Sequence, residues 1–324
     1  MSELRPRAWT PPPDPGLAGP YTENDRLAGA RRMPVPGEGP EDVVGREDGR
    51  IAYGLADGRV MTMSPDGAEH RLLADTGGRP LGLEAHPDGR LVVCDARRGL
   101  LAVDNAGRVE VLTDAFEGEA FGFTNNAAIA DDGTIYFTVS SRRFGIDEYR
   151  SDLLEHSNTG RLFRLAPDGG PELLVDGLSF ANGVTLAGGR LFVAETGEYR
   201  IRVVDPDTGT HGPFAENLPG IPDNLTTGSG DVVWAAMFTP RNRLLDLLLP
   251  RPRLRGLVAR LPEAVQPQPV RHGFVLGFDA STGEVVENLQ DPDGAYAPIT
   301  SAREHDERLW LGSLTEPAIA VLER

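Results

Sequence analysis

The fold can be read from one stretch, Leu178-Ser-Phe-Ala-Asn-Gly-Val-Thr-Leu-Ala-Gly-Gly-Arg-Leu-Phe-Val-Ala-Glu-Thr-Gly-Glu-Tyr-Arg-Ile-Arg-Val-Val-Asp-Pro-Asp-Thr-Gly209. It holds three short apolar runs, at 184–186, 191–194 and 201–204, which are separated by glycine turns and ended by Asp205-Pro206. Short β-branched or aromatic runs bounded by Gly, Pro and Asp are typical of antiparallel hairpins and not of helices. The stretch therefore predicts three consecutive strands, with Asn182 just before the first.

The turn between the first two strands recurs along the chain. Each copy precedes a short apolar run, and the copies are Glu47-Asp-Gly-Arg50, Pro87-Asp-Gly-Arg90, Asp131-Asp-Gly-Thr134, Gly188-Gly-Arg190, Gly228-Ser-Gly-Asp231 and His305-Asp-Glu-Arg308. A repeat of roughly 40 residues built from four short strands is typical of a β-propeller blade. The sequence thus predicts an all-β fold, a six-bladed β-propeller.

The two ends of the chain set the predicted domain limits. Residues 1–26 include Pro11-Pro-Pro-Asp-Pro15, which is too rich in proline for a helix or a central strand, so we expect an extended N-terminal arm. Residues 27–324 form the single propeller domain. The sixth repeat ends at Arg324 with only its inner strands, so we expect residues 28–35 to supply its outer strand and reduce free sheet edges.

Two segments between predicted strands are longer than the other connections in the repeat. Residues 140–160 are polar and interrupt one blade, whereas residues 242–263 carry apolar side chains at helical spacing broken by Pro250 and Pro252. We interpret 242–263 as a short helical excursion between blades that covers a binding pocket, because long loops in compact domains are often lids. A dimer contact or a cover for a blade edge fits the pattern equally well.

Composition narrows the class of function. The 324 residues carry a formal charge of −17, which argues against nucleic-acid and anionic-membrane partners. The sequence has no Lys, so it cannot form a Schiff base with a lysine, and its single cysteine, Cys94, excludes an intrachain disulfide and a Cys-rich zinc site. With no signal-peptide pattern and no run of about 18 apolar residues, we expect a cytoplasmic protein that acts on a small molecule. The oligomeric state is left open.

Four oxygen-bearing side chains occupy matching positions in successive repeats, each at or just before the first strand: Glu41, Asn125, Asn182 and Asp223. In a propeller these positions converge on the central axis. Carboxylate and amide oxygens suit Ca²⁺, although another divalent cation is possible. A single Asn or Asp at such a place more often bonds the adjoining turn, but two carboxylates in a closed channel need a cation or a shared proton.

Several other motifs add to this picture. Five sets of motifs are distributed along the chain: Gly78-Arg-Pro-Leu-Gly-Leu83, Phe180-Ala-Asn-Gly183 with Val193-Ala-Glu-Thr196, Pro222-Asp-Asn224, Val258-Ala-Arg-Leu-Pro-Glu263, and Ile299-Thr-Ser301 with Leu311-Gly-Ser-Leu314. Together they resemble the strictosidine synthase-like branch of the six-bladed propeller superfamily that includes SMP-30/gluconolactonase and the paraoxonases. The similarity extends from about Pro20 onward. It implies that Glu41, Asn125, Asn182 and Asp223 hold Ca²⁺, with Asp223 as the catalytic base or nucleophile.

Two departures from the resemblance matter. The catalytic histidine of paraoxonases would fall at Leu81, and the acid/base glutamate of strictosidine synthase would fall near Thr300. Condensation of an amine with an aldehyde is therefore disfavoured, and hydrolysis of a lactone or an ester is the main hypothesis. A non-hydrolytic tailoring enzyme and a non-catalytic binding propeller are the alternatives. Substrate contacts are expected from Asn224, Phe121, Phe238, Arg241 and Tyr296.

Overall fold

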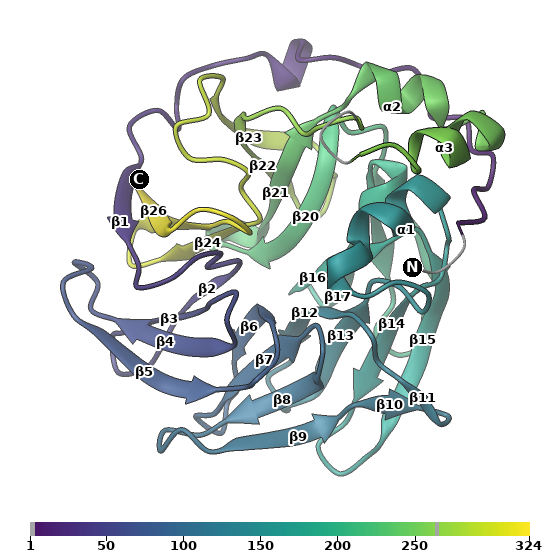
Figure 1. The fold of residues 1–324 in the computed structure, drawn as a ribbon. Coiled ribbons are helices and arrows are strands. Elements are labelled where there is room, and N and C mark those ends of the chain that lie inside the picture. Colours follow the sequence, from purple (N-terminus) through teal and green to yellow (C-terminus); the bar gives the residue numbers. More distant parts are fainter. Residues whose placement is uncertain (1–3, 263–265) are drawn as a thin grey trace.

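The computed structural model describes residues 4–262 and 266–324. These residues form six four-stranded antiparallel sheets arranged around a common axis (Figure 1). The prediction of a six-bladed β-propeller is confirmed.

The first three blades follow one another along the chain, each from its innermost to its outermost strand. Blade 1 contains β2 (Val43–Gly45), β3 (Ile51–Gly54), β4 (Arg59–Met63) and β5 (His70–Asp75); blade 2 contains β6 (Pro80–Ala85), β7 (Leu91–Asp95), β8 (Gly99–Val103) and β9 (Val109–Thr113); blade 3 contains β12 (Thr124–Ile129), β13 (Ile135–Val139), β14 (Gly160–Leu165) and β15 (Pro171–Leu178). A small hairpin, β10 (Ala115–Phe116) with β11 (Glu119–Ala120), links blades 2 and 3.

Blades 4 and 5 repeat this order, and blade 6 closes the ring. Blade 4 contains β16 (Ala181–Ala187), β17 (Arg190–Glu195), β18 (Arg200–Val204) and β19 (His211–Ala215); blade 5 contains β20 (Gly220–Thr227), β21 (Val232–Pro240), β22 (Gly273–Asp279) and β23 (Val285–Asp291); blade 6 contains β24 (Ser301–His305), β25 (Arg308–Gly312), β26 (Ala318–Glu323) and β1 (Arg31–Pro34). In every blade the recurring turn of the sequence joins the innermost strand to the second one.

The ring is closed by the two ends of the chain. Strand β1 pairs antiparallel with β26, with Met33 opposite Ile319, so the N-terminal segment forms the outer strand of blade 6 as the sequence predicted. The side chain of Met33 is 2% exposed and packs into the apolar cluster between blades 6 and 1 together with Trp310 and Tyr53.

Two insertions carry helices, and both connect the second strand of a blade to its third. Helix α1 (Tyr149–Glu155) lies between β13 and β14, whereas α2 (Arg243–Leu248) and α3 (Pro252–Val258) lie between β21 and β22. The helical excursion predicted for 242–263 is thus found within blade 5, and its last residue, Glu263, lies outside the described residues. Helix α2 begins at Asn242, whose side chain accepts hydrogen bonds from the amides of Leu244 and Leu245.

The described part of the N-terminal arm runs along these helices (Figure 1). The amide of Arg7 donates to the carbonyl of Glu155 at the end of α1, and the amide of Trp9 donates to the carbonyl of Leu249 just after α2. The Trp9 ring also stacks on His156, with ring centroids 4.9 Å apart. No helix in residues 4–262 or 266–324 is long and apolar enough to cross a membrane.

Because β1 closes the ring through Met33, shortening this side chain should weaken the whole propeller. We expect Met33→Ala to lower the free energy of unfolding by about 2–5 kcal/mol, since it leaves a cavity in a packed core. Urea denaturation measures the change. The matched control is Leu72→Ala on β5, where the leucine is 59% exposed and the change should stay within about 0.5 kcal/mol. Equal effects of the two variants would contradict the closure argument.

Candidate functional site

A cavity of about 130 Å³ lies on the propeller axis. Each blade contributes at least one residue of its innermost strand, or of the segment just before that strand, to the lining, and these include Glu41, Leu81, Asn125, Asn182, Asp223 and Thr300. The four predicted metal ligands therefore surround one cavity. The same cavity is lined by Leu81 and Thr300, the positions at which the resemblance placed catalytic groups of relatives. Neither side chain can act as an acid or a base at neutral pH.

A repeated backbone irregularity brings these side chains to the axis. In β6, β12, β16 and β20 the pairing with the second strand skips two residues, which are Leu81 and Gly82, Asn125 and Asn126, Asn182 and Gly183, and Asp223 and Asn224. An irregularity of this kind frees residues from the ladder and redirects a side chain. In each pair the first residue lines the cavity. The second residue contacts the next blade at Gly82, Asn126 and Gly183, whereas the side chain of Asn224 donates to Glu41.

In three of these pairs, the second residue fixes the spacing between blades. An added Cβ on Gly183 would lie 2.2 Å from the amide nitrogen of Leu225 in blade 5, and one on Gly82 would lie 2.7 Å from the Cα of Asn126 in blade 3. Only glycine allows such close backbone approach. Asn126 instead accepts a hydrogen bond from the amide of Val184, at 3.0 Å. Blades 3, 4 and 5 are locked together in this way directly beside the cavity.

Three of the four candidate ligands present buried oxygen atoms without a hydrogen-bond partner among the described residues. These atoms are Oε2 of Glu41, Oδ1 of Asn125 and Oδ1 of Asn182. The other ends of two of the side chains are held: Asn224 Nδ2 donates to Oε1 of Glu41 at 3.0 Å, and Asn125 Nδ2 donates to Oγ of Ser140 at 2.8 Å. Buried oxygens without partners are costly, and oxygen ligands are what Ca²⁺ requires, so the residues fit a hard cation.

The electrostatics of the carboxylates of Glu41 and Asp223 also favour a bound cation. Burial, followed by the negative charges of Asp223 and Asp42, raises the pKa of Glu41 well above its usual range. Burial also raises the pKa of Asp223 to about 8, against a hydrogen bond from Asn182 that lowers it. Two anionic carboxylates are therefore unfavourable here unless a positive charge joins them.

The neighbouring carboxylate of Asp42 shows the contrast. Its Oδ1 and Oδ2 accept hydrogen bonds from the amides of Val43 and Leu83, and its Oδ2 lies 3.7 Å from the guanidinium of Arg303. Its charge is thus compensated by the protein. Within the described residues there is no group of three or more His, Cys, Asp or Glu suited to a metal, so the candidate site depends on the amide oxygens of Asn125 and Asn182 as well as on Glu41 and Asp223.

The cavity walls are apolar and were only partly predicted. Two phenylalanines and an isoleucine, Phe123, Phe180 and Ile221, stand two residues before Asn125, Asn182 and Asp223 and line the cavity with them. The same spacing occurs in three successive repeats, so a comparison of the repeats could have identified all three. Sequence reasoning selected Phe121 instead.

Three of the predicted substrate contacts are corrected by the structure. Phe121 packs in the core against Phe137 and Phe163, with ring centroids 5.5 and 5.0 Å away. Tyr296 is buried, and its hydroxyl donates to the carbonyls of Leu311 and Ala318. None of these groups faces the cavity.

Arg241 is the third correction, because it binds the N-terminal arm. Its guanidinium donates to the carbonyl of Pro12 at 3.0 Å and lies over the Tyr199 ring. Phe238 does line the cavity, and Asn224 reaches the site only through its hydrogen bond to Glu41.

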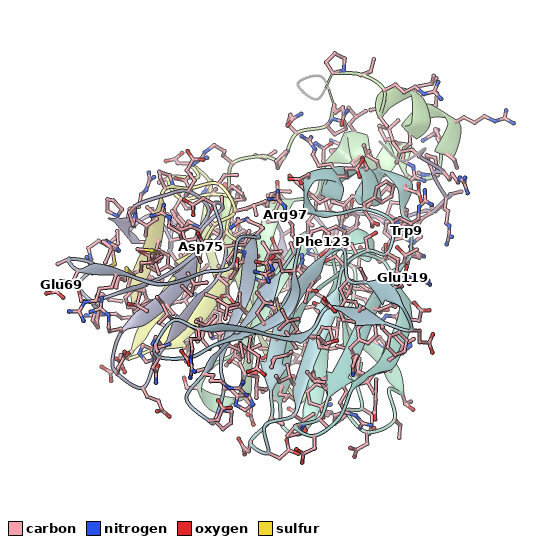
Figure 2. The ribbon with its side chains drawn as sticks, turned by 60° about the horizontal axis from the view of Figure 1, so that its bottom comes forward. Trp9, Glu69, Asp75, Arg97, Glu119 and Phe123 are labelled. Carbon is pink, nitrogen blue, oxygen red and sulfur yellow. The ribbon has the colours of Figure 1, made fainter. Side chains whose placement is uncertain are left out.

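The helical insertions cover the cavity. Ile146, Tyr149 and Leu153 contribute side chains from the segment around α1, and Asn242 and Leu245 contribute from α2. Figure 2 shows the helices standing on one end of the propeller, with Phe123 beneath them. The segment 266–269 completes the cover, and Arg150 donates to the carbonyl of Pro267 at 2.9 Å. The cavity is thus polar at the axis and is lined toward the helices by both apolar and polar side chains.

A methyl group at Gly183 should disturb both the blade spacing and the site. We expect Gly183→Ala to lower the free energy of unfolding by about 1–3 kcal/mol, because its Cβ would overlap the backbone of blade 5. Thermal denaturation measures this change. Gly212→Ala in β19 of the same blade is the control, since nothing lies within 4 Å of its added Cβ. A stability for Gly183→Ala equal to that of the control would refute the packing argument.

Helix α1 carries a buried carboxyl that should couple stability to pH. Burial raises the pKa of Asp152 to about 6, although hydrogen bonds from Ser141 and Ser157 oppose the shift. The folded protein therefore holds this proton between pH 3.8 and about 6 while the unfolded chain releases it, so this contribution to stability is lost as the pH rises through that window.

The variant Asp152→Asn removes the titration and should flatten the fall in unfolding free energy across that window, measured by urea denaturation at several pH values. Asp279→Asn is the control, because a hydrogen bond from Ser281 holds the pKa of Asp279 at about 2. Identical pH slopes for the wild type and Asp152→Asn would contradict the assignment.

Comparisons with known proteins agree with this architecture. The family model described as SMP-30/gluconolactonase/LRE-like region matches residues 46–244, and the strictosidine synthase-like N-terminal model matches residues 19–63. The adipocyte plasma membrane-associated protein of Rattus norvegicus is 33% identical over 99% of this chain and 93% of its own length. The strictosidine synthase-like 10 protein of Arabidopsis thaliana is 36% identical over 76% of this chain and 70% of its own length.

Solved structures show the same fold. A gluconolactonase from Xanthomonas campestris superposes with a TM-score of 0.67 at 20% identity, covering 92% of this chain and 91% of its own. A luciferin-regenerating enzyme superposes with a TM-score of 0.66 at 13% identity, covering 91% of this chain and 96% of its own. At these identities the likeness concerns the fold alone.

Proposed function

Because the chain belongs to the SMP-30/gluconolactonase/LRE-like family, we propose that it is a Ca²⁺-dependent hydrolase of a lactone or an ester. Membership of this family supports a lactonase-type enzyme at the family level. The observation that carries the proposal is the set of buried oxygens of Glu41, Asn125 and Asn182, which have no hydrogen-bond partner among the described residues and surround one cavity with Asp223.

Glu41, Asn125, Asn182 and Asp223 would hold the cation. When bound, a divalent cation polarises a carbonyl oxygen and stabilises negative charge that develops on it. Asn224 keeps the Glu41 carboxylate in place through its 3.0 Å hydrogen bond, and Thr300 Oγ1 fixes the backbone of Glu41 by donating to its carbonyl oxygen at 2.6 Å.

The remaining steps belong to the chain's own groups. Glu41 and Asp223 are the acidic residues among the described cavity-lining residues, and Glu41 is already engaged by Asn224. We therefore assign to Asp223 the removal of a proton from the water that attacks the carbonyl carbon, and the delivery of that proton to the alkoxide oxygen released when the acyl C–O bond breaks. The apolar walls and the helical cover orient the substrate and limit access of bulk water. A condensation that needs a further carboxylate near Thr300 is less well supported, because the cavity offers none there.

Metal binding is tested without reference to catalysis. Adding Ca²⁺ at about a hundredfold excess over its dissociation constant should stabilise the protein by about 2.7 kcal/mol, seen as a rise in melting temperature. Glu41→Gln and Asn125→Ala should lose this rise. Glu69→Gln is the matched control, because this carboxylate is exposed at the outer rim, far from the helices (Figure 2).

Hydrolysis is then measured with aryl esters and simple lactones before and after removal of divalent cations with EDTA. We expect activity that EDTA abolishes and Ca²⁺ restores, and a loss of at least about a hundredfold in kcat for Asp223→Asn. Cation binding without hydrolysis would favour a binding propeller or a non-hydrolytic enzyme. The proposal fails altogether if neither Ca²⁺ binding nor hydrolysis is found.

A further inference from the structure

Exposed apolar side chains are unevenly distributed over this protein. Among the large hydrophobic residues that the structure shows to be exposed, six lie between residues 244 and 270: Leu244, Leu247, Leu254, Leu257, Leu261 and Val270. The others, Leu72, Val111, Leu173 and Val286, belong to outer strands of four different blades. Scattered exposed leucines are ordinary, but a contiguous group on one short segment indicates an interaction surface.

Helix α2 is apolar on two sides. In and just after α2, Leu245 lines the cavity and Leu248 and Leu249 are buried, while Leu244 and Leu247 point outward with 54% and 61% exposure. A helix that only covered a pocket would present polar residues to water. We call the outward set of Leu244, Leu247, Leu254, Leu257 and Leu261 the leucine surface.

The charge around the leucine surface is opposite to that of the whole chain. Residues 242–262 contain five arginines and a single acidic residue, Asp246, although the chain as a whole carries −17. Four of these arginines are exposed: Arg243, Arg251, Arg253 and Arg260. The fifth, Arg255, is buried and donates a hydrogen bond to the carbonyl of Arg7 in the N-terminal arm. Within the described residues 242–262, the exposed charged side chains beside these leucines are all arginines.

We propose that the leucine surface and its arginines bind the surface of an anionic phospholipid bilayer. Exposed leucines beside arginines are the combination by which a helix lies in the lipid interface, with apolar groups among the acyl chains and cations at the phosphates. Neither helix is long enough to span a bilayer, so the contact is peripheral. The helices stand beyond the end of the propeller, with side chains directed away from it (Figure 2).

The charge complementarity distinguishes this ligand from a second copy of the chain meeting it through the same surface. Two leucine surfaces face to face would oppose arginine with arginine, which is unfavourable. The argument from sequence against an anionic membrane used the net charge of the whole chain. Charges more than about 8 Å from the contact are largely screened at physiological salt, so the local arginines decide the interaction.

The leucine surface lies on the same helical segment that covers the cavity. The same α2 helix that carries Leu244 and Leu247 outward sends Leu245 into the cavity, and Gln266 to Pro269 complete the cover. Binding to a bilayer would place this cover at the lipid interface, where apolar molecules are concentrated.

The test is co-sedimentation of the full chain with phosphatidylcholine vesicles, alone or with about 30% phosphatidylglycerol. We expect binding to the vesicles with phosphatidylglycerol that decreases at high salt. Replacing Leu247 and Leu257 by Gln should reduce that binding at least about tenfold, because two leucines no longer enter the acyl region. The matched control replaces Leu72 and Leu173, exposed leucines of β5 and β15, by Gln and should bind as the wild type does.

Melting temperatures of both double variants show that they are folded, because exposed substitutions should leave stability nearly unchanged. Absence of binding to phosphatidylglycerol vesicles would overturn the proposal, as would equal loss in the control. Analytical ultracentrifugation completes the design: a concentration-dependent dimer that only the Leu247 and Leu257 variant abolishes would assign the surface to a second copy and would also overturn it.

Discussion

The structure depends on how six innermost strands satisfy their polar groups on the side that faces the axis. Each of these strands has a sheet partner on its outer side, and an unpaired edge in the interior is unfavourable. Side chains of neighbouring blades supply the missing partners. Thr138 Oγ1 donates to the carbonyl of Asn182, Thr196 Oγ1 to that of Pro222, and Thr226 Oγ1 to that of Ala302. These hydrogen bonds join blades 3, 4, 5 and 6 in succession, and the buried oxygens left without partners among the described residues include three that face the cavity, on Glu41, Asn125 and Asn182.

The fold and the axial residues could be predicted from the sequence because both depend on a repeat. A turn that recurs with an apolar strand after it fixes the blade, and Asn182 and Asp223 occupy the same place in that repeat, so they must meet at the axis. The apolar wall follows the same logic through Phe123 and Phe180. Arg241 and Tyr296 could not be placed in this way, since their partners, the N-terminal arm for Arg241 and the carbonyls of β25 and β26 for Tyr296, carry no periodic signal.

Local charge differs from the net charge of the chain at two places in this protein. The propeller holds the adjacent carboxylates of Glu41 and Asp42 in different surroundings, because Arg303 lies beside Asp42 and the cavity lies beside Glu41. On the outside, a chain with an overall charge of −17 gathers arginines around α2 and α3. In both places the electrostatic environment depends on charged groups within a few ångströms, and the net charge of the whole chain does not reveal it.

The pairing of β1 with β26 joins strands that are separated by nearly the whole chain. During synthesis, β1 leaves the ribosome long before β26 does, and the intervening blades have their own hairpin partners as soon as they emerge. Blade 6 cannot form until β24, β25 and β26 have been synthesised, and until then blades 1 and 5 each lack a neighbour. Closure of the ring therefore requires the last strand of blade 6, and the apolar flanks of blades 1 and 5 stay uncovered until that strand has been synthesised.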